Sequence, residues 1–299
     1  MFGDDREVPD QPQIEIGNHV RSLRVMHARH DDLQNGSWTA AQGRCCDSAM
    51  TIVFVNGVPV TSAVWTPLIN ELSRTQTQDL VRLSPPGFGS PLGPRFGATF
   101  ADYCDWLIAE LSRFETPVHL VGHSLAGGYV LEVAMTRPDL LRSWVSETVA
   151  GYEPDYTWHD VAKLWQTPGT GERHVEELFS GDVAQRAARM VDWGIPEPTA
   201  GEVALGQGPD MGRAILALYR SLSQTVLAER GRDLPKAAAR PGLVPVATED
   251  LTVGSVATRH RAARRAGARA VDLDGIGHWW MLQDPARAAR MLSDFWRSV

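Results

Sequence analysis

Short apolar segments and amphipathic segments alternate along two stretches of this 299-residue chain, and the alternation limits the folds open to it. The predicted strands cover residues 50–58, 79–84, 118–122, 141–145, 243–248 and 268–273. The predicted helices cover residues 62–74, 99–114, 125–136, 256–266 and 285–298. Strands that alternate with helices predict a mostly parallel central sheet flanked by helices on both faces, which is the α/β class.

Residues 151–240 interrupt this alternation, because they are helical and looped and contain no strand pattern. One helix is indicated there by apolar residues at helical spacing, with Asp210 as its N-cap. Those residues are Ile215, Leu218, Tyr219, Leu222 and Val226. We therefore predict an α/β core made of residues 1–150 and 241–299, with residues 151–240 inserted as a helical cap. Residues 1–13 are polar and are predicted to form a loose N-terminal arm.

Residues 122–127, Gly-His-Ser-Leu-Ala-Gly, join the predicted strand 118–122 to the predicted helix 125–136. Small residues at both ends of this turn let neighbouring backbone segments pass close to it. A serine there projects its hydroxyl from the sheet edge, where the helix N-terminus favours developing negative charge. We predict Ser124 as a nucleophile; the alternative interpretation is that it only caps the helix.

A serine hydroxyl needs a base within hydrogen-bond reach, because it is a poor nucleophile at neutral pH. Of the nine histidines, His278 follows the predicted strand 268–273 on a glycine-bearing loop. Such a loop lies at the carboxyl end of the sheet, where ligands bind in open α/β folds. We predict His278 as the general base and acid. His123 is the rival, but it adjoins Ser124 across a tight turn and should point away from it.

The histidine of such a site is oriented by a carboxylate. Asp250 follows the predicted strand 243–248 and precedes His278 by 28 positions, which is enough for one helix and one strand. Glu249 is its neighbour, and Glu147 ends the last strand before the helical segment. We predict Asp250 as the acid and keep Glu147 and Glu249 as alternatives.

Four segments of the chain together resemble the α/β-hydrolase superfamily. Residues 56–59, together with Trp65, are similar to the oxyanion loop of the superfamily, and residues 84–89 are similar to its Pro-Gly turn. Residues 122–127 are similar to its nucleophile elbow, and residues 277–279 are similar to its histidine loop. The resemblance covers residues 50–150 and 241–299. Within the superfamily, the chain looks like the lid-bearing group of small esterases, cofactor-free haloperoxidases, carbon–carbon bond hydrolases, epoxide hydrolases and haloalkane dehalogenases.

Carried over to this sequence, the resemblance implies an oxyanion hole made by the backbone N–H groups of Val58 and Leu125. Two positions depart from the family pattern, because Asn56 stands where the family usually has His and Ser84 where it usually has Asp. We expect different hydrogen bonds at these positions rather than lost activity. Epoxide hydrolases and haloalkane dehalogenases use an Asp nucleophile, so Ser124 argues against both activities.

These residues predict a serine hydrolase that cleaves an ester or related acyl bond of a small, apolar substrate through an acyl-enzyme. One alternative is carbon–carbon bond hydrolysis, acyl transfer or perhydrolysis at the same site, and another is a non-catalytic protein that binds a small molecule. Four tryptophans indicate an apolar substrate pocket, unless they only pack the cap against the core. They are Trp158, Trp165, Trp193 and Trp279.

The composition argues against several classes of partner. A net charge of −7 is unsuited to binding nucleic acid or an anionic membrane. Cys45, Cys46 and Cys104 form no disulfide framework, and we recognise no secretory signal, so we expect reduced thiols and a cytoplasmic protein.

No metal or cofactor is predicted, and the expected partner is a small-molecule substrate. His27 and His30 fall on or just after a strand predicted over residues 14–29 and have no third ligand nearby. Gly87 and Gly89 are not followed by the third glycine of a dinucleotide-binding turn. The sequence predicts no oligomeric state.

Overall fold

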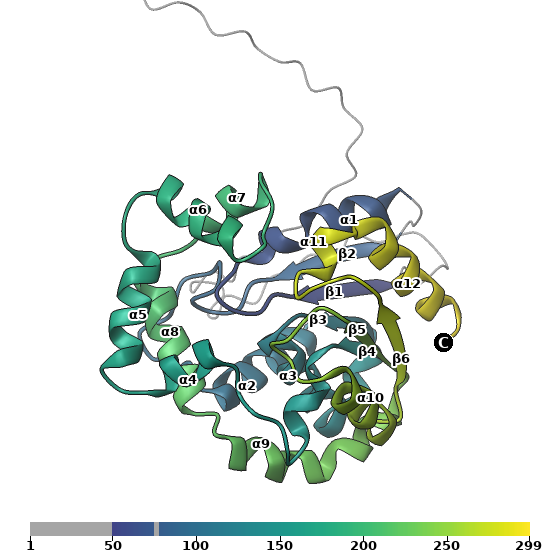
Figure 1. Cartoon of the computed structure of the whole chain (residues 1–299). Helices are drawn as coiled ribbons and strands as arrows, with labels where there is room; N and C mark the ends of the chain where they lie inside the picture. The colour runs from purple at the N-terminus through teal and green to yellow at the C-terminus, as the bar shows by residue number, and fades with distance from the viewer. Residues whose placement is uncertain (1–49, 75–77) are drawn as a thin grey trace, which may run out of the picture.

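The computed structural model describes residues 50–74 and 78–299, and a six-stranded sheet forms their centre (Figure 1). All neighbouring strands pair in parallel, in the order β2-β1-β3-β4-β5-β6. The strands are β1 (Thr51–Val55), β2 (Asp79–Leu83), β3 (Val118–Gly122), β4 (Leu141–Ser146), β5 (Gly242–Ala247) and β6 (Arg269–Leu273). The predicted α/β fold with a parallel central sheet is confirmed.

Helices cover both faces of this sheet. The helices α1 (Thr66–Ser73) and α12 (Pro285–Arg297) pack together over one face, and α2 (Phe100–Leu111), α3 (Leu125–Thr136) and α10 (Val256–Arg265) cover the other (Figure 1). Because the sheet is covered twice, every residue of β3 is buried. This burial explains why β3 appears in the sequence as an apolar run rather than as alternating apolar and polar residues.

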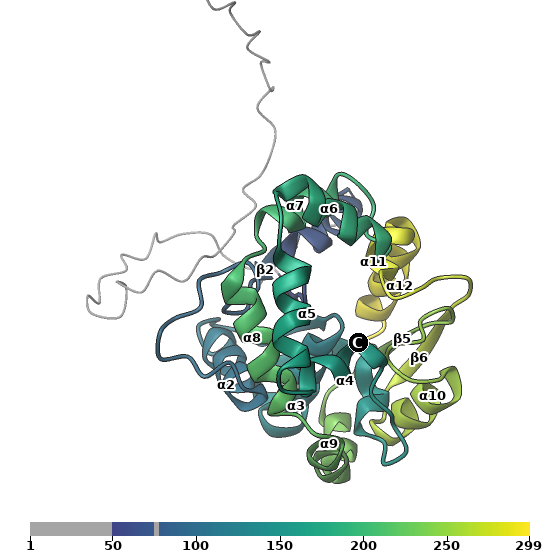
Figure 2. The same cartoon turned by 60° about the vertical axis from the view of Figure 1, so that its left-hand side comes forward.

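The chain between β4 and β5 is helical. Its elements are η4 (Thr148–Tyr152), α4 (Asp160–Gln166), α5 (Thr170–Phe179), α6 (Val183–Asp192), α7 (Thr199–Leu205), α8 (Pro209–Arg220), α9 (Gln224–Arg230) and η5 (Gly231–Ala239). The structure describes all of residues 151–240 and contains no strand there. Figures 1 and 2 show α5, α6, α7 and α8 gathered on one side of the molecule, away from α10 and β6.

The predicted N-cap at Asp210 is wrong. The helix α8 begins at Pro209 with Gly208 as its N-cap, because the fixed φ of proline suits the first helical position. The predicted helix is also divided in two. Ser223 begins the separate helix α9 by accepting a hydrogen bond from the backbone N–H of Val226, so the predicted apolar face spans two helices.

Several predictions fall outside the described residues, namely those for residues 1–13, residues 14–29, His27, His30, Cys45 and Cys46. Cys104 is buried in α2 and is a free thiol. Within residues 50–74 and 78–299, no group of three or more His, Cys, Asp or Glu side chains is arranged to hold a metal ion. None of the helices in that part of the chain combines the length and the apolar character that a membrane span requires.

The carboxyl ends of the strands meet along one edge of the sheet, and the strand order reverses there. From β1 the chain adds β2 on one side, whereas β3, β4, β5 and β6 extend the sheet on the other. Ligands bind at such a reversal in open α/β sheets, because the loops leave in opposite directions and open a crevice. Residues that follow these strands include Val58, Ser124, Thr148, Thr252 and His278.

The turn after β3 depends on glycine at position 122. A Cβ atom at Gly122 would lie 2.6 Å from Val130 Cγ2 and 2.7 Å from the Ala126 carbonyl oxygen. We predict that Gly122→Ala lowers the free energy of unfolding by about 1–3 kcal/mol, because the start of α3 must shift to accept the methyl group. Urea unfolding measures this loss. Gly93→Ala is the matched control, since its added Cβ meets no atom within 4 Å; equal losses in both variants would contradict the prediction.

Candidate active site

Ser124 occupies the junction between β3 and α3 with φ 54° and ψ −134°. A positive φ is rare for a residue that carries a side chain, and such strain clusters at functional sites. The Ser124 side chain makes no capping hydrogen bond to α3, so the interpretation of this serine as a helix cap is not supported. Ser124 instead lines a cavity at the carboxyl edge of the sheet.

The segment that follows β1 passes directly against this turn at Gly57. A Cβ atom at Gly57 would lie 2.6 Å from both Ser124 Cβ and the His123 carbonyl oxygen, so only glycine permits the approach. The approach brings the segment after β1 beside the N-terminus of α3. Val58 and Leu125, the residues predicted to form the oxyanion hole, line the same cavity as Ser124.

Asn56, one of the two departures from the family pattern, makes hydrogen bonds through its side chain. The buried Asn56 donates from Nδ2 to the carbonyl oxygens of Val60 at 2.8 Å and Phe88 at 3.4 Å. These bonds tie the loop after β1 to the turn after β2. At the other departure, the backbone carbonyl oxygen of Ser84 accepts a hydrogen bond from Ser90 Oγ at 2.9 Å, and this bond does not depend on the Ser84 side chain.

His278 and Asp250 are joined by a hydrogen bond of 2.8 Å between His278 Nδ1 and Asp250 Oδ2. The Asp250 side chain is 1% exposed and the His278 side chain 19% exposed. Asp250 Oδ1 accepts two further hydrogen bonds, from the Thr252 backbone N–H at 2.8 Å and from its hydroxyl at 2.7 Å. Both oxygens of this buried carboxylate are therefore satisfied, and His278 lines the cavity together with Ser124.

Burial alone would favour the neutral forms of both groups. For Asp250, burial is outweighed by attraction to His278 and by hydrogen bonds from His278 and Thr252, so its pKa is held well below its usual range. For His278, burial is outweighed by the Asp250 carboxylate and by Glu147, which together raise its pKa. The arrangement thus stabilises a charged imidazolium next to an ionised carboxylate.

The three carboxylates considered as the acid occupy different environments. Asp250 contacts His278, whereas Glu249 is exposed. Glu147 is buried behind the turn and accepts a hydrogen bond from the backbone N–H of Ser124. Of the three, the structure brings Asp250 into contact with the histidine.

His123 and Glu147 form a buried pair behind His278. The Nε2–H of His123 donates to the His278 carbonyl oxygen at 3.0 Å and lies 3.6 Å from Glu147 Oε1. Burial lowers the pKa of His123 well below its usual range, with a smaller contribution from His278. His123 Nδ1 is buried without a partner among the described residues. The contacts of His123 therefore support the backbone of His278, and none of them places it as a base for Ser124.

Arg259 is one of several arginines along the predicted helix 256–266, a run typical of a solvated helix face, and the sequence does not place it in the site. Its side chain is buried and donates to the carbonyl oxygens of Ala247 at 2.8 Å and Asp250 at 3.1 Å. Arg259 thereby fastens the end of β5 to the loop that carries Asp250. Its guanidinium also interacts electrostatically with the carboxylates of Asp250 and Glu147.

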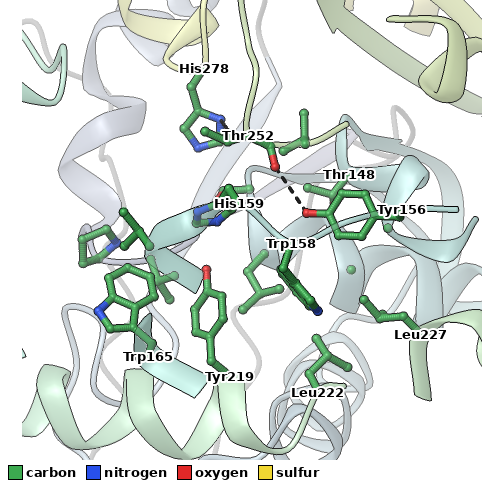
Figure 3. A pocket seen from close by; sticks show the side chains of 18 of the residues that line it. Thr148, Tyr156, Trp158, His159, Trp165, Tyr219, Leu222, Leu227, Thr252 and His278 are labelled. Carbon is green, nitrogen blue, oxygen red and sulfur yellow. Dashed lines mark hydrogen bonds between the residues drawn. The ribbon is translucent and has the colours of Figure 1, made fainter. Parts of the chain in front are cut away.

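A cavity of about 250 Å³ lies between the carboxyl ends of the strands and the helical segment (Figure 3). All four predicted pocket tryptophans line it, namely Trp158, Trp165, Trp193 and Trp279. Tyr156, His159 and Tyr219 also line it and were not predicted as site residues. Among the described residues that form its wall, none is Asp, Glu, Lys or Arg.

Two of these tryptophans also hold the helical segment against the sheet. Trp279 Nε1 donates to the Trp193 carbonyl oxygen at 2.7 Å. A second link is the hydrogen bond of 3.2 Å from Gln207 Nε2 to the Pro59 carbonyl oxygen, next to Val58. Lining the cavity and packing the helical segment on the core are therefore compatible roles for these side chains.

Residues 52–291 match the sequence profile of the Alpha/beta hydrolase family, and the chain belongs to this family. A relative is the (E)-2-((N-methylformamido)methylene)succinate hydrolase of Acinetobacter baylyi, 30% identical over 92 residues. That match covers 30% of this chain and 34% of the relative, so it spans about a third of the relative's length.

Solved structures share the fold over most of the chain. A haloalkane dehalogenase from Bradyrhizobium elkani superimposes with a TM-score of 0.62 and 20% identity, covering 85% of this chain and 93% of that one. The enol-lactonase from Burkholderia xenovorans gives a TM-score of 0.61 and 19% identity, covering 84% and 92%. At these identities the likeness establishes the fold and not the reaction.

The buried Glu147 predicts a pH-dependent stability. Burial raises its pKa to about 7, although the hydrogen bond from Ser124 opposes the rise. Between its ordinary pKa and about 7 the folded protein keeps a proton that the unfolded chain loses, so Glu147 lowers stability as the pH rises through that window. We predict that Glu147→Gln is more stable than the parent at pH 8, by up to about 3 kcal/mol.

That gain should shrink as the pH falls and approach zero below about 4.5, where Glu147 becomes protonated in both the folded and the unfolded state. Urea unfolding at pH 5, 6, 7 and 8 measures the difference between the two proteins. A difference that does not change with pH would show that the Glu147 carboxyl titrates normally in the folded protein.

Proposed function

We propose that this protein is a serine hydrolase that cleaves an ester or related acyl bond through an acyl-enzyme. The observation that carries the proposal is the 2.8 Å hydrogen bond from His278 Nδ1 to Asp250, beside a serine at positive φ on the wall of the same cavity. A carboxylate bound to Nδ1 selects the tautomer whose Nε2 is unprotonated. Nε2 is then ready to accept the serine proton.

In the proposed reaction, Ser124 Oγ attacks the acyl carbonyl carbon while His278 Nε2 takes the hydroxyl proton. The oxyanion that forms accepts hydrogen bonds from the backbone N–H groups of Val58 and Leu125, which are worth a few kcal/mol in the transition state. His278 then protonates the leaving group as its bond to carbon breaks. Water attacks the acyl group on Ser124, His278 takes the proton of the water and returns it to Ser124 Oγ, and the acid is released.

The cavity wall supports an uncharged, mostly apolar substrate. The name of the Acinetobacter relative denotes a succinate, which is a dicarboxylate. No described residue on the cavity wall of this chain is Lys or Arg. A buried carboxylate without a cation would lose several kcal/mol of solvation. We therefore propose that this protein acts on neutral acyl compounds.

The nucleophile is tested by labelling with a fluorophosphonate. We predict covalent labelling of the parent protein and turnover of p-nitrophenyl pentanoate, both abolished in Ser124→Ala. A folded parent protein that is neither labelled nor active would favour the non-catalytic binding protein. Identification of the products separates hydrolysis from acyl transfer, perhydrolysis or carbon–carbon bond cleavage.

The same assay tests the neutrality of the substrate. Mono-p-nitrophenyl glutarate has the same number of acyl carbons as the pentanoate ester, with a carboxylate in place of the terminal methyl group. We expect its kcat/KM to be at least about tenfold lower, because the carboxylate must lose its solvation in the cavity. Equal kcat/KM values for the two esters would contradict the proposal of a neutral substrate, and they would not bear on the proposal that Ser124 is the nucleophile.

The acid is tested by Asp250→Asn. We predict at least a hundredfold loss of kcat, because an amide at this position can donate to Nδ1 and selects the wrong histidine tautomer. In the parent protein kcat/KM should rise with pH through a midpoint above about 6.5, since His278 acts as a base only when neutral and its pKa is raised. Glu249→Gln, at the exposed neighbour, should retain the parent rate. A larger loss in Glu147→Gln than in Asp250→Asn would identify Glu147 as the acid.

A further inference from the structure

Several polar side chains on the cavity wall are not satisfied by the protein, and the indole N–H of Trp158 is one of them. Other polar groups on the wall are satisfied by the protein. The hydroxyls of Thr148 and Thr252 form hydrogen bonds with other side chains, and Tyr156 donates to the Thr252 carbonyl oxygen at 3.2 Å (Figure 3). His159 Nε2 and the Tyr219 hydroxyl, by contrast, have no partner among the described residues. Tyr219 is buried and His159 is half-buried, and polar atoms on a cavity wall that the protein leaves unpaired are available to a ligand.

The position of the proton on His159 is set by the helix that follows it. His159 is the N-cap of α4, and its Nδ1 accepts a hydrogen bond of 3.2 Å from the backbone N–H of Ala162. An accepting Nδ1 leaves the proton on Nε2. Burial lowers the pKa of His159 to about 4, with a smaller effect of the His278 charge. At neutral pH His159 is therefore an uncharged donor toward the cavity, within electrostatic reach of His278.

Tyr219 holds its hydroxyl in place through aromatic packing. Its ring centre lies 4.8 Å from that of Trp165 and 5.6 Å from that of Trp158, and the residue is 3% exposed. Burial raises the pKa of the phenol, so the hydroxyl keeps its proton. Figure 3 shows this hydroxyl pointing toward His159. The two side chains thus present two uncharged donors to one region of the cavity.

We propose that His159 Nε2–H and the Tyr219 hydroxyl form a subsite for a second carbonyl oxygen of the substrate. One carbonyl oxygen has two lone pairs and can accept both hydrogen bonds. A wall without Lys or Arg favours a neutral ketone over a carboxylate at this point. The substrate class is then an acyl compound that carries an oxo group on its chain. The inference rests on the proposed function, in which Ser124 attacks the other carbonyl.

Binding to the Ser124→Ala protein tests the subsite without turnover. The ligands are methyl hexanoate and methyl 3-, 4- and 5-oxohexanoate, titrated against the fluorescence of the tryptophans that line the cavity. We expect at least one oxo ester to bind about tenfold or more tightly than methyl hexanoate, because one or two hydrogen bonds are added in a desolvated site. Adding Tyr219→Phe or His159→Asn should remove most of this preference.

The variants are chosen to separate the subsite from general damage. Asparagine is a good N-cap, so His159→Asn keeps the start of α4, and its shorter side chain withdraws the donor from the position of His159 Nε2 in the cavity. Tyr156→Phe removes a hydroxyl that the protein already satisfies, and it should leave the ratio of oxo-ester to plain-ester affinity unchanged. A thermal melt of each variant confirms that it is folded before the ratio is measured.

The subsite is overturned if no oxo ester binds more tightly than methyl hexanoate. It is also overturned if Tyr219→Phe and His159→Asn keep the full preference. Turnover by the parent protein reports separately on the hydrolase proposal. A binding preference without any ester turnover would support the subsite and contradict the hydrolase proposal. Ester turnover without a binding preference would support the hydrolase proposal and contradict the subsite.

Discussion

The turn at Ser124 requires backbone segments to approach one another more closely than side chains normally allow. Gly57 touches the turn from the β1 side, and Gly122 lies against the first turn of α3, with no room for a Cβ atom at either position. A positive φ at a non-glycine residue costs about 1–3 kcal/mol, and it persists here because β3 and α3 are buried on all sides. The serine and the N-terminus of α3 are therefore held together before any substrate binds, and the rest of the site is arranged around them.

Two buried carboxylates lie near this turn, and their surroundings give them different properties. Asp250 has donors on both oxygens, so it stays ionised and orients His278. Glu147 Oε1 accepts from the Ser124 backbone, while Oε2 has no partner among the described residues. Its pKa of about 7 follows from that poorer solvation. The guanidinium of Arg259 interacts electrostatically with both carboxylates and anchors the loop that carries Asp250.

The wall of the cavity bears on which substrate can bind beside Ser124. Its wall is aromatic and uncharged, so selection there depends on shape and on hydrogen bonds rather than on ion pairs. A site that donates hydrogen bonds to a substrate oxygen discriminates between substrates more strongly than an apolar pocket that responds only to the number of methylene groups. A ligand without that oxygen leaves the donors unpaired and therefore binds more weakly. The donors at His159 and Tyr219 come from the helical segment, and the proposed nucleophile and base come from the sheet edge. One fold can thus keep its reacting groups and change its substrate through that segment.

The sequence by itself determined the order of strands and helices, the serine at a strand-to-helix turn and the histidine on a glycine-bearing loop. These features depend on local periodicity and on small residues at particular positions, which a single sequence displays. It narrowed the acid to Asp250, Glu147 and Glu249, but the choice required the tertiary structure, because the carboxylates end strands at or near the same sheet edge and only neighbouring donors distinguish them. The N-cap of α8 is Gly208 rather than the predicted Asp210, because Pro209 occupies the first helical position. The remaining site residues, Arg259, His159 and Tyr219, come from segments that meet only in the folded chain. Their burial and their free hydrogen-bonding atoms are properties of packing, so no local pattern could encode them.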